Sequence, residues 1–122
     1  MILADTSVWI DHLRHRDPEL ERLLSGGQIV MHPYVVAEMS LGSLRNRKKI
    51  LDDMEALLEA NVATIAEVRH MIETHALYAK GIGLTDAHLI ASCLLTPGTR
   101  LWTRDAAMKK VAASLRILTN LP

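Results

Sequence analysis

The sequence predicts an α/β fold in which a mainly parallel sheet lies between two layers of helices. Short apolar segments with strand character alternate with longer segments of helical periodicity. The first of them, residues 1–5, is an apolar run that ends in an acid, which suits a buried parallel strand followed by a turn. No linker, repeat or low-complexity stretch interrupts the 122 residues, so we expect one domain spanning 1–122, built as a three-layer α/β/α sandwich.

The first quarter of the chain predicts two strands that flank two helices. After the strand at residues 1–5, apolar residues recur at helical spacing. A second helix begins at Asp17-Pro18, where proline suits the first turn, and ends at Gly26-Gly27. The second strand is expected at residues 28–32.

The middle of the chain is expected to be mostly helical. Pro33 opens a helix that ends near Gly42. An amphipathic stripe predicts another helix from Asn46 to Ala60, a short β-like segment follows at 62–65, and a further helix spans about 66–80. Four residues are expected on the inward side of the helix that Pro33 opens: Tyr34, Val35, Met39 and Leu41.

The last third of the chain returns to alternating helices and strands. Thr85 is expected to cap a helix that continues through Leu95. A strand follows at residues 100–103, Asp105 begins the last helix, and residues 116–118 form a short final strand. The predicted strands are therefore separated by helices, as a parallel sheet requires.

Composition limits the classes of protein to which the chain can belong. No apolar run reaches the ~18 residues of a membrane span, and the amino terminus lacks the pattern of a signal peptide, so we expect a soluble, cytoplasmic protein. The 14 basic and 14 acidic side chains balance, so overall charge does not indicate a nucleic-acid partner. The single cysteine, Cys93, lies in an apolar run and is expected to be a buried thiol.

Four acidic residues, which we call the acidic quartet, are placed where they could share a site: Asp5, Glu38, Asp86 and Asp105. Asp5 and Asp105 follow two predicted strands, and sites in open parallel sheets form beyond the carboxyl ends of strands. Asp86 lies in the first turn of a helix, and Glu38 is expected on an apolar helix face. Four converging carboxylates would oppose folding unless divalent cations bound there, and such hard oxygen ligands suit Mg²⁺ or Mn²⁺.

Each member of the quartet also has a structural explanation, which the sequence leaves open. The three aspartates stand where an acid caps or stabilises the amino terminus of a helix. A carboxylate at Glu38 on a core-facing stripe needs a donor, a counter-charge or a metal, and a salt bridge with an arginine is its alternative.

Basic residues could supply phosphate contacts despite the zero net charge. Outside the quartet the chain has 14 basic and 10 acidic side chains, a balance of +4. The densest basic cluster lies at residues 45–49, and it is equally explained as a solvated helix start that pairs with Asp52, Asp53 and Glu55. The other candidates for phosphate contacts are Arg14, Arg16, Arg104, Lys109 and Lys110.

Four separated motifs resemble those of the PIN-domain family, and within it the VapC toxins of bacterial toxin–antitoxin pairs. They are DTSVWI at residues 5–10, Glu38 on a helix, LTDAHLIA at residues 84–91 and LWTRD at residues 101–105. Their order and spacing extend the resemblance over nearly the whole chain. Met108 departs from the pattern, since relatives often carry an aromatic residue in the last helix, a difference that concerns packing more than chemistry.

The resemblance implies a function, a cofactor and partners. It implies an endoribonuclease that hydrolyses RNA phosphodiester bonds with one or two Mg²⁺ or Mn²⁺ ions held by the acidic quartet. Thr6 and Thr103 match hydroxyl positions that commonly line the same site. A VapB-like antitoxin that blocks the site and a toxin homodimer are also implied. The alternative is a non-catalytic PIN-like RNA-binding or scaffold domain, in which the acids are only structural.

Overall fold

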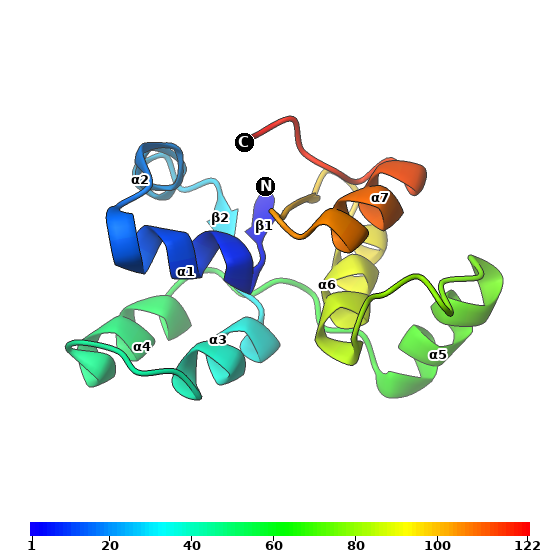
Figure 1. The fold of residues 1–122 in the computed structure, drawn as a ribbon, viewed down its shortest axis with the longest axis horizontal. Coiled ribbons are helices and arrows are strands. Elements are labelled where there is room, and N and C mark those ends of the chain that lie inside the picture. The colour runs from blue at the N-terminus through cyan, green and yellow to red at the C-terminus, as the bar shows by residue number, and fades with distance from the viewer.

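Three short parallel strands form the centre of the structure, a computed structural model that describes all of residues 1–122 (Figure 1). They are β1 (Ile2–Ala4), β2 (Ile29–Val30) and β3 (Arg100–Trp102), and β1 lies between the other two. Both pairings are parallel, so the three carboxyl ends meet at one edge of the sheet. Single parallel bridges, from Met31 to Glu59 and from Leu101 to Leu118, extend the sheet beyond β2 and β3.

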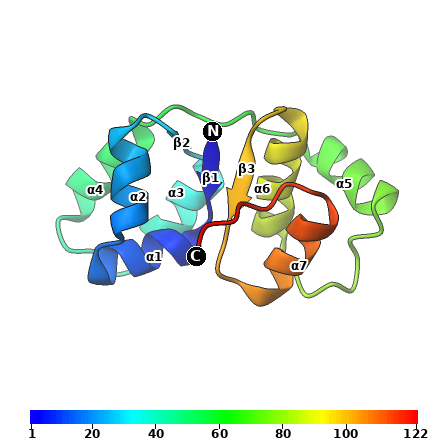
Figure 2. The same ribbon diagram turned by 90° about the horizontal axis from the view of Figure 1, so that it is seen from above.

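Seven helices flank the sheet, and the predicted α/β/α sandwich is confirmed. In both views α1 to α4 lie on one side of the strands and α5 to α7 on the other (Figures 1 and 2). The helices are α1 (Thr6–His15), α2 (Pro18–Ser25), α3 (Pro33–Ser40), α4 (Arg47–Glu55), α5 (Ile65–Thr74), α6 (Leu84–Leu95) and α7 (Ala106–Ser114).

The core explains why the strands are continuous apolar runs. Because helices cover both faces of the sheet, adjacent strand residues such as Leu3 and Ala4 are buried together, as are Leu101 and Trp102. Burial of a leucine side chain such as Leu3 or Leu101 stabilises the fold by about 1.5–3 kcal/mol relative to an exposed one. The sheet can therefore be short and still hold Asp5 and Thr103, the next residues along, in fixed places.

Three predicted segments differ from the structure, and hydrogen bonds to the backbone account for the first two. The β-like segment at 62–65 is wrong, because the Thr64 hydroxyl accepts the Glu67 N–H at 3.1 Å and a helix begins at Ile65. The helix predicted to reach residue 60 ends at Glu55. The segment after it pairs with the sheet edge instead, where the Met31 N–H donates to the Leu58 carbonyl and the Met31 carbonyl accepts the Ala60 N–H. The next helix ends at Thr74 rather than near residue 80.

The last third of the chain departs less from prediction. Gly83, not Thr85, is the cap residue of α6, which starts at Leu84. The strand predicted at 116–118 is reduced to one bridge with Leu101, although two backbone hydrogen bonds accompany it. Length and apolar character together fall short of a membrane span in every helix of the structure.

Cys93 lies inside α6 and is 3% exposed, so the expected buried thiol is confirmed. Burial raises the pKa of its thiol to about 12, because a thiolate loses its hydration in an apolar setting. The side chain therefore serves as a small apolar group in the core.

Candidate active site

The carboxyl ends of β1 and β3 bring Asp5 and Thr103 into direct contact. The Thr103 hydroxyl donates a hydrogen bond to Oδ2 of Asp5, and its oxygen accepts the Asp105 N–H at 3.1 Å. Asp5 is 3% exposed and Thr103 is 1% exposed. A chain of two hydrogen bonds therefore connects the amino terminus of α7 to the residue that follows β1.

Asp5 caps α1, as the structural explanation of this acid predicted. Its Oδ1 accepts the Ser7 N–H at 2.6 Å and the Thr6 hydroxyl at 3.2 Å. With Thr103 it has three donors, which offset the cost of burying the carboxylate. Capping leaves further lone pairs on both oxygens, so it does not preclude a second role as a metal ligand.

Asp86 and Asp105 each use one carboxylate oxygen at a helix amino terminus. Oδ2 of Asp86 accepts the Gly83 N–H at 2.9 Å, and Oδ1 of Asp105 accepts the Met108 N–H at 2.8 Å. The second oxygen of each makes no hydrogen bond within the chain. Both acids thus stand at the positive ends of α6 and α7 with one oxygen free for a ligand.

Glu38 does not lie on the core-facing side of its helix, so that prediction was wrong. The buried side of α3 carries Val35, Val36 and Met39, whereas Leu41 is 87% exposed and Tyr34 lies at the surface. Glu38 is exposed on that outer side and forms no ion pair with a lysine or arginine. The salt-bridge alternative for this residue is therefore wrong as well.

Electrostatics places the four acids of the quartet around one region. Burial raises the pKa of Asp86 most, and the negative charges of Asp5, Asp105 and Glu38 raise it further, while the Gly83 N–H lowers it. The other three carboxylates therefore lie within electrostatic reach of Asp86. No three acidic, histidine or cysteine side chains lie close enough together to form a metal-ligand cluster.

Arg104 does not face solvent as a phosphate contact, which corrects that expectation. Its guanidinium donates to Asp11 at 2.7 Å and to Asp17, and Nε donates to the Pro122 carbonyl at 3.1 Å. Its side chain is 23% exposed. The residue thus ties the loop between β3 and α7 to α1 and to the turn before α2.

The same loop is fixed at its backbone. The Arg104 N–H donates to the Ser7 hydroxyl at 3.0 Å, and the guanidinium lies 5.4 Å from the centre of the Trp102 ring. Sequence reasoning missed Asp11, Asp17 and Ser7 as supports of the site. Nothing in their spacing marks them, because their common partner lies 87 to 97 residues further along the chain.

The other basic residues divide into paired and unpaired sets. Arg16 pairs with Glu21 on the surface, so its guanidinium already has a counter-charge in this structure. Lys48 and Lys49 pair with Asp52 and Asp53, as the helix-surface explanation of the basic cluster predicted. Four residues from the candidate phosphate contacts and the cluster make no side-chain ion pair or hydrogen bond: Arg14, Arg45, Lys109 and Lys110.

Two buried histidines lie near the site without hydrogen-bonding to it. His32 caps α3 by accepting the Tyr34 N–H at Nδ1, and His88 packs on the Tyr34 ring with the ring centres 4.2 Å apart. Burial, with a smaller contribution from His88, lowers the pKa of His32 to about 4, and burial lowers the pKa of His88 too. Both rings are therefore neutral near pH 7, which disfavours a paired-histidine reaction.

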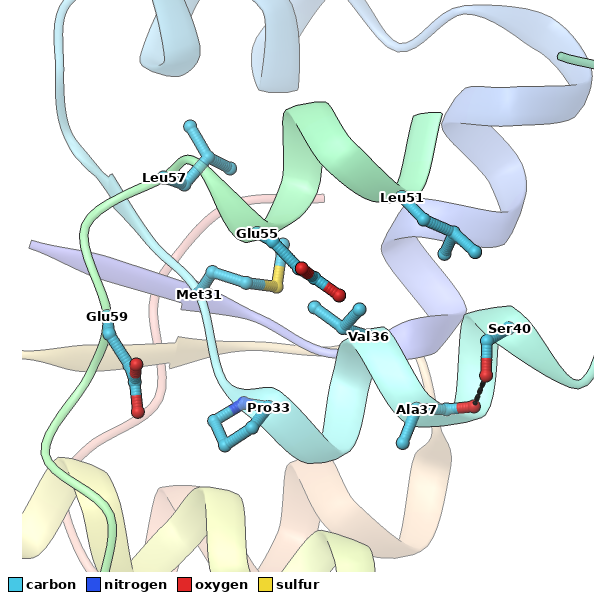
Figure 3. A pocket seen from close by; sticks show the side chains of 9 residues that line it. All are labelled: Met31, Pro33, Val36, Ala37, Ser40, Leu51, Glu55, Leu57 and Glu59. Atoms are coloured by element: carbon cyan, nitrogen blue, oxygen red, sulfur yellow. Dashed lines mark hydrogen bonds between the residues drawn. The ribbon is translucent and has the colours of Figure 1, made fainter. Parts of the chain in front are cut away.

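A separate pocket of about 430 Å³ contains two carboxylates, but neither belongs to the quartet. Figure 3 shows Val36 and Ser40 reaching it from α3 and Glu55 from α4, with Glu59 on the segment that follows. The pocket lies by Met31, which bridges to Glu59 beyond β2, and no residue of the quartet lines it.

Comparison with known proteins assigns the family. The PIN domain matches residues 2–114. Ribonuclease VapC32 of Mycobacterium tuberculosis, from strains CDC 1551 / Oshkosh and ATCC 25618 / H37Rv, is 42% identical over 113 residues, which cover 93% of this chain and 91% of that protein. The resemblance carried by the four sequence motifs is confirmed, and the chain belongs to the PIN-domain family as a VapC-like member.

Proposed function

We propose that this protein is a metal-dependent endoribonuclease that hydrolyses RNA phosphodiester bonds at the acidic quartet, and that it acts as the toxin of a VapBC-type pair. Its likeness to a protein named a ribonuclease, over nearly the full length of both chains, supports the activity. The observation that carries the location is the pair of hydrogen bonds by which Thr103 joins Asp5 to Asp105 at the strand ends. The negative charges of Asp5, Asp105 and Glu38, which help to raise the pKa of Asp86, support it. A site that concentrates negative charge in this way is suited to a cation and a phosphate together.

The donor set fits Mg²⁺ or Mn²⁺, one or two ions, for a chemical reason. The quartet supplies only hard oxygen ligands, and Glu38, Asp86 and Asp105 retain oxygens that no group of the chain binds. The chain belongs to the PIN-domain family, whose ribonucleases generally depend on a metal, and this membership supports the same proposal. When bound, the ion would lower the pKa of a water molecule and stabilise the negative charge that develops on the phosphate.

The chain's own residues orient the reactants. Asp5 is held by the donors Ser7, Thr6 and Thr103, so its carboxylate direction is fixed before RNA arrives. The amino termini of α1, α6 and α7 lie at the quartet, where their partial positive charge favours a bound phosphate. In the reaction one P–O bond of the RNA breaks and the elements of water are added across it.

The proposal includes a VapB-like antitoxin, a homodimer and a cytoplasmic location, since RNA is the substrate. Trp9, Met39 and Met54 do not suit these interfaces, because all three are buried in the core. Exposed apolar side chains are better candidates, and they include Leu41 and Leu58.

The test is cleavage of RNA by the purified protein, freed of any antitoxin. Total cellular RNA is incubated with Mg²⁺ or Mn²⁺, beside an EDTA control and the Asp5→Asn variant. Discrete metal-dependent fragments that are absent from both controls are expected. RNA that stays intact while it binds the protein would instead favour the non-catalytic RNA-binding domain.

A further inference from the structure

A groove runs beside the acidic quartet, and one member of the quartet is part of its wall. It measures about 370 Å³ and lies among α1, α3, the loop after α3 and α4, which gather on one side of the sheet (Figure 1). Glu38 lines it, so the groove begins at the proposed catalytic site. Its size falls in the range of pockets that hold small molecules.

The groove combines apolar walls with two free cations. Ile10, Leu13, Leu44 and Ile50 supply the apolar part, and Arg14 and Arg45 the charge. Both arginines are exposed, and neither forms an ion pair or a side-chain hydrogen bond. By contrast Arg47, two residues after Arg45, is bound to the Ser40 carbonyl at 2.7 Å.

We propose that this groove binds the nucleotide next to the scissile phosphate, with the base against the apolar walls and one phosphate on each of Arg14 and Arg45. The inference rests on the proposed ribonuclease function and deepens it. Single-stranded RNA is recognised through splayed bases that pack on side chains and on guanidinium planes, and through charge-assisted contacts to phosphates. The groove offers both kinds of contact, and Glu38 lines the same groove.

RNA suits this groove better than an apolar peptide does. A peptide would cover the walls but leave two guanidinium groups without counter-charges, whereas a nucleotide brings one phosphate on either side of its base. The arginines also offset the negative field of the quartet, which otherwise repels an approaching phosphate chain. Substrate capture is therefore expected to depend on them and on ionic strength.

The test compares two double variants of the full-length protein. Arg14→Gln with Arg45→Gln removes the proposed contacts, and Lys48→Gln with Lys49→Gln removes the same charge from side chains already paired on the surface of α4. Initial rates of cleavage of a single-stranded RNA are measured with Mg²⁺ or Mn²⁺ between about 50 and 300 mM salt. Thermal melts verify that both variants fold.

For two phosphate contacts, counterion release predicts that the slope of log kcat/KM against log salt becomes shallower by about 1.4. The corresponding loss in kcat/KM is about tenfold at 0.15 M salt, carried by KM, while kcat changes little. The lysine variant is expected to keep the slope of the unmodified protein. Equal losses in both variants, or none in the arginine variant, would overturn the proposal.

Two further outcomes separate this inference from the function beneath it. Absence of cleavage by the unmodified protein contradicts the proposed function itself. Unchanged RNA kinetics in the arginine variant, together with weaker binding of an antitoxin, would overturn the nucleotide site and assign the groove to a protein partner.

Discussion

The two sides of the acidic quartet are built in different ways. Asp5 and Asp105 are joined through Thr103. Asp5 and Thr103 are buried at the ends of β1 and β3, and Arg104 ties the loop after β3 to Asp11 of α1. On the other side, the Asp86 carboxylate accepts one hydrogen bond, from the Gly83 N–H, and the Glu38 carboxylate accepts none from the chain. Folding thus fixes half of the site before any ligand binds, and we infer that a cation and RNA position the other half. Variants on each side test that division.

Removing charge from the fixed side is expected to have the largest effect. Loss of a group that merely orients a metal ligand lowers activity about 10–100-fold, so Asp5→Asn is expected to lower kcat/KM for RNA by more than about 100-fold. The fold should survive, because an amide oxygen can still accept the Ser7 N–H. Cleavage assays measure kcat/KM and a circular dichroism melt measures stability, with Asp53→Asn on the surface of α4 as the control. Full activity in a folded Asp5→Asn protein would contradict the assignment.

Thr103→Val keeps the shape of the side chain and removes the hydroxyl that links Asp5 to Asp105. The carboxylate of Asp5 loses one donor and the Asp105 N–H loses its acceptor, so kcat/KM is expected to fall about 10–100-fold. Thr103→Ser should restore most of the activity, because the hydroxyl returns. If the valine variant cleaves as well as the serine variant, the link has no role in the reaction.

Arg104→Gln breaks the brace of the fixed side and is expected to act mainly on stability. Asp11 and Asp17 lose their partner in a partly buried setting, at a cost of about 2 kcal/mol in the free energy of unfolding. The matched control is Arg16→Gln, whose pair with Glu21 is 83% exposed at the arginine and should cost much less, because solvent screens a surface ion pair. Urea titrations of both variants measure the difference. Similar costs would mean that Arg104 is no more than a surface pair.

Asp86→Asn tests the loosely held side through stability, where it is expected to have the smallest of these effects, with a sign set by pH and metal. The folded protein raises the pKa of this carboxyl above its ordinary value of 3.8. The stability that it contributes is therefore complete below that value and is lost as pH rises through the raised pKa. In EDTA at neutral pH the variant should melt at a higher temperature than the unmodified protein, and the gap should close towards pH 4. If Asp86→Asn melts at a lower temperature than the unmodified protein in EDTA at pH 7, the negative charges of the quartet do not destabilise the metal-free fold.

The fold was largely predictable because strands and helices of this chain carry local signals. Pro18 and Pro33 mark helix starts and the runs around Leu3 and Leu101 mark buried strands, and each lies where the pattern predicts. Helix ends were less predictable. Arrest of α4 at Glu55 depends on hydrogen bonds to Met31, which no local pattern encodes.

The candidate site was predictable only in part. The helix-capping positions of Asp5 and Asp105 follow from local sequence, whereas the exposure of Glu38 depends on how α3 packs. The role of Arg104 could not be read from its neighbours, because its partners are distant in sequence. A lone basic residue looks the same in sequence whether it will meet a phosphate or a carboxylate.

Because Cys93 is buried, the native protein is expected to react little with thiol-labelling reagents. A thiol whose pKa is about 12 holds well under ~0.1% thiolate at pH 8, and only the thiolate reacts with maleimides or iodoacetamide. Because the chain has no other cysteine, a cysteine introduced at the exposed Leu41 would be the sole reactive position. A fluorophore there, one turn from Glu38, would report the arrival of RNA or of a partner at the site, with no need to replace any native residue of the core.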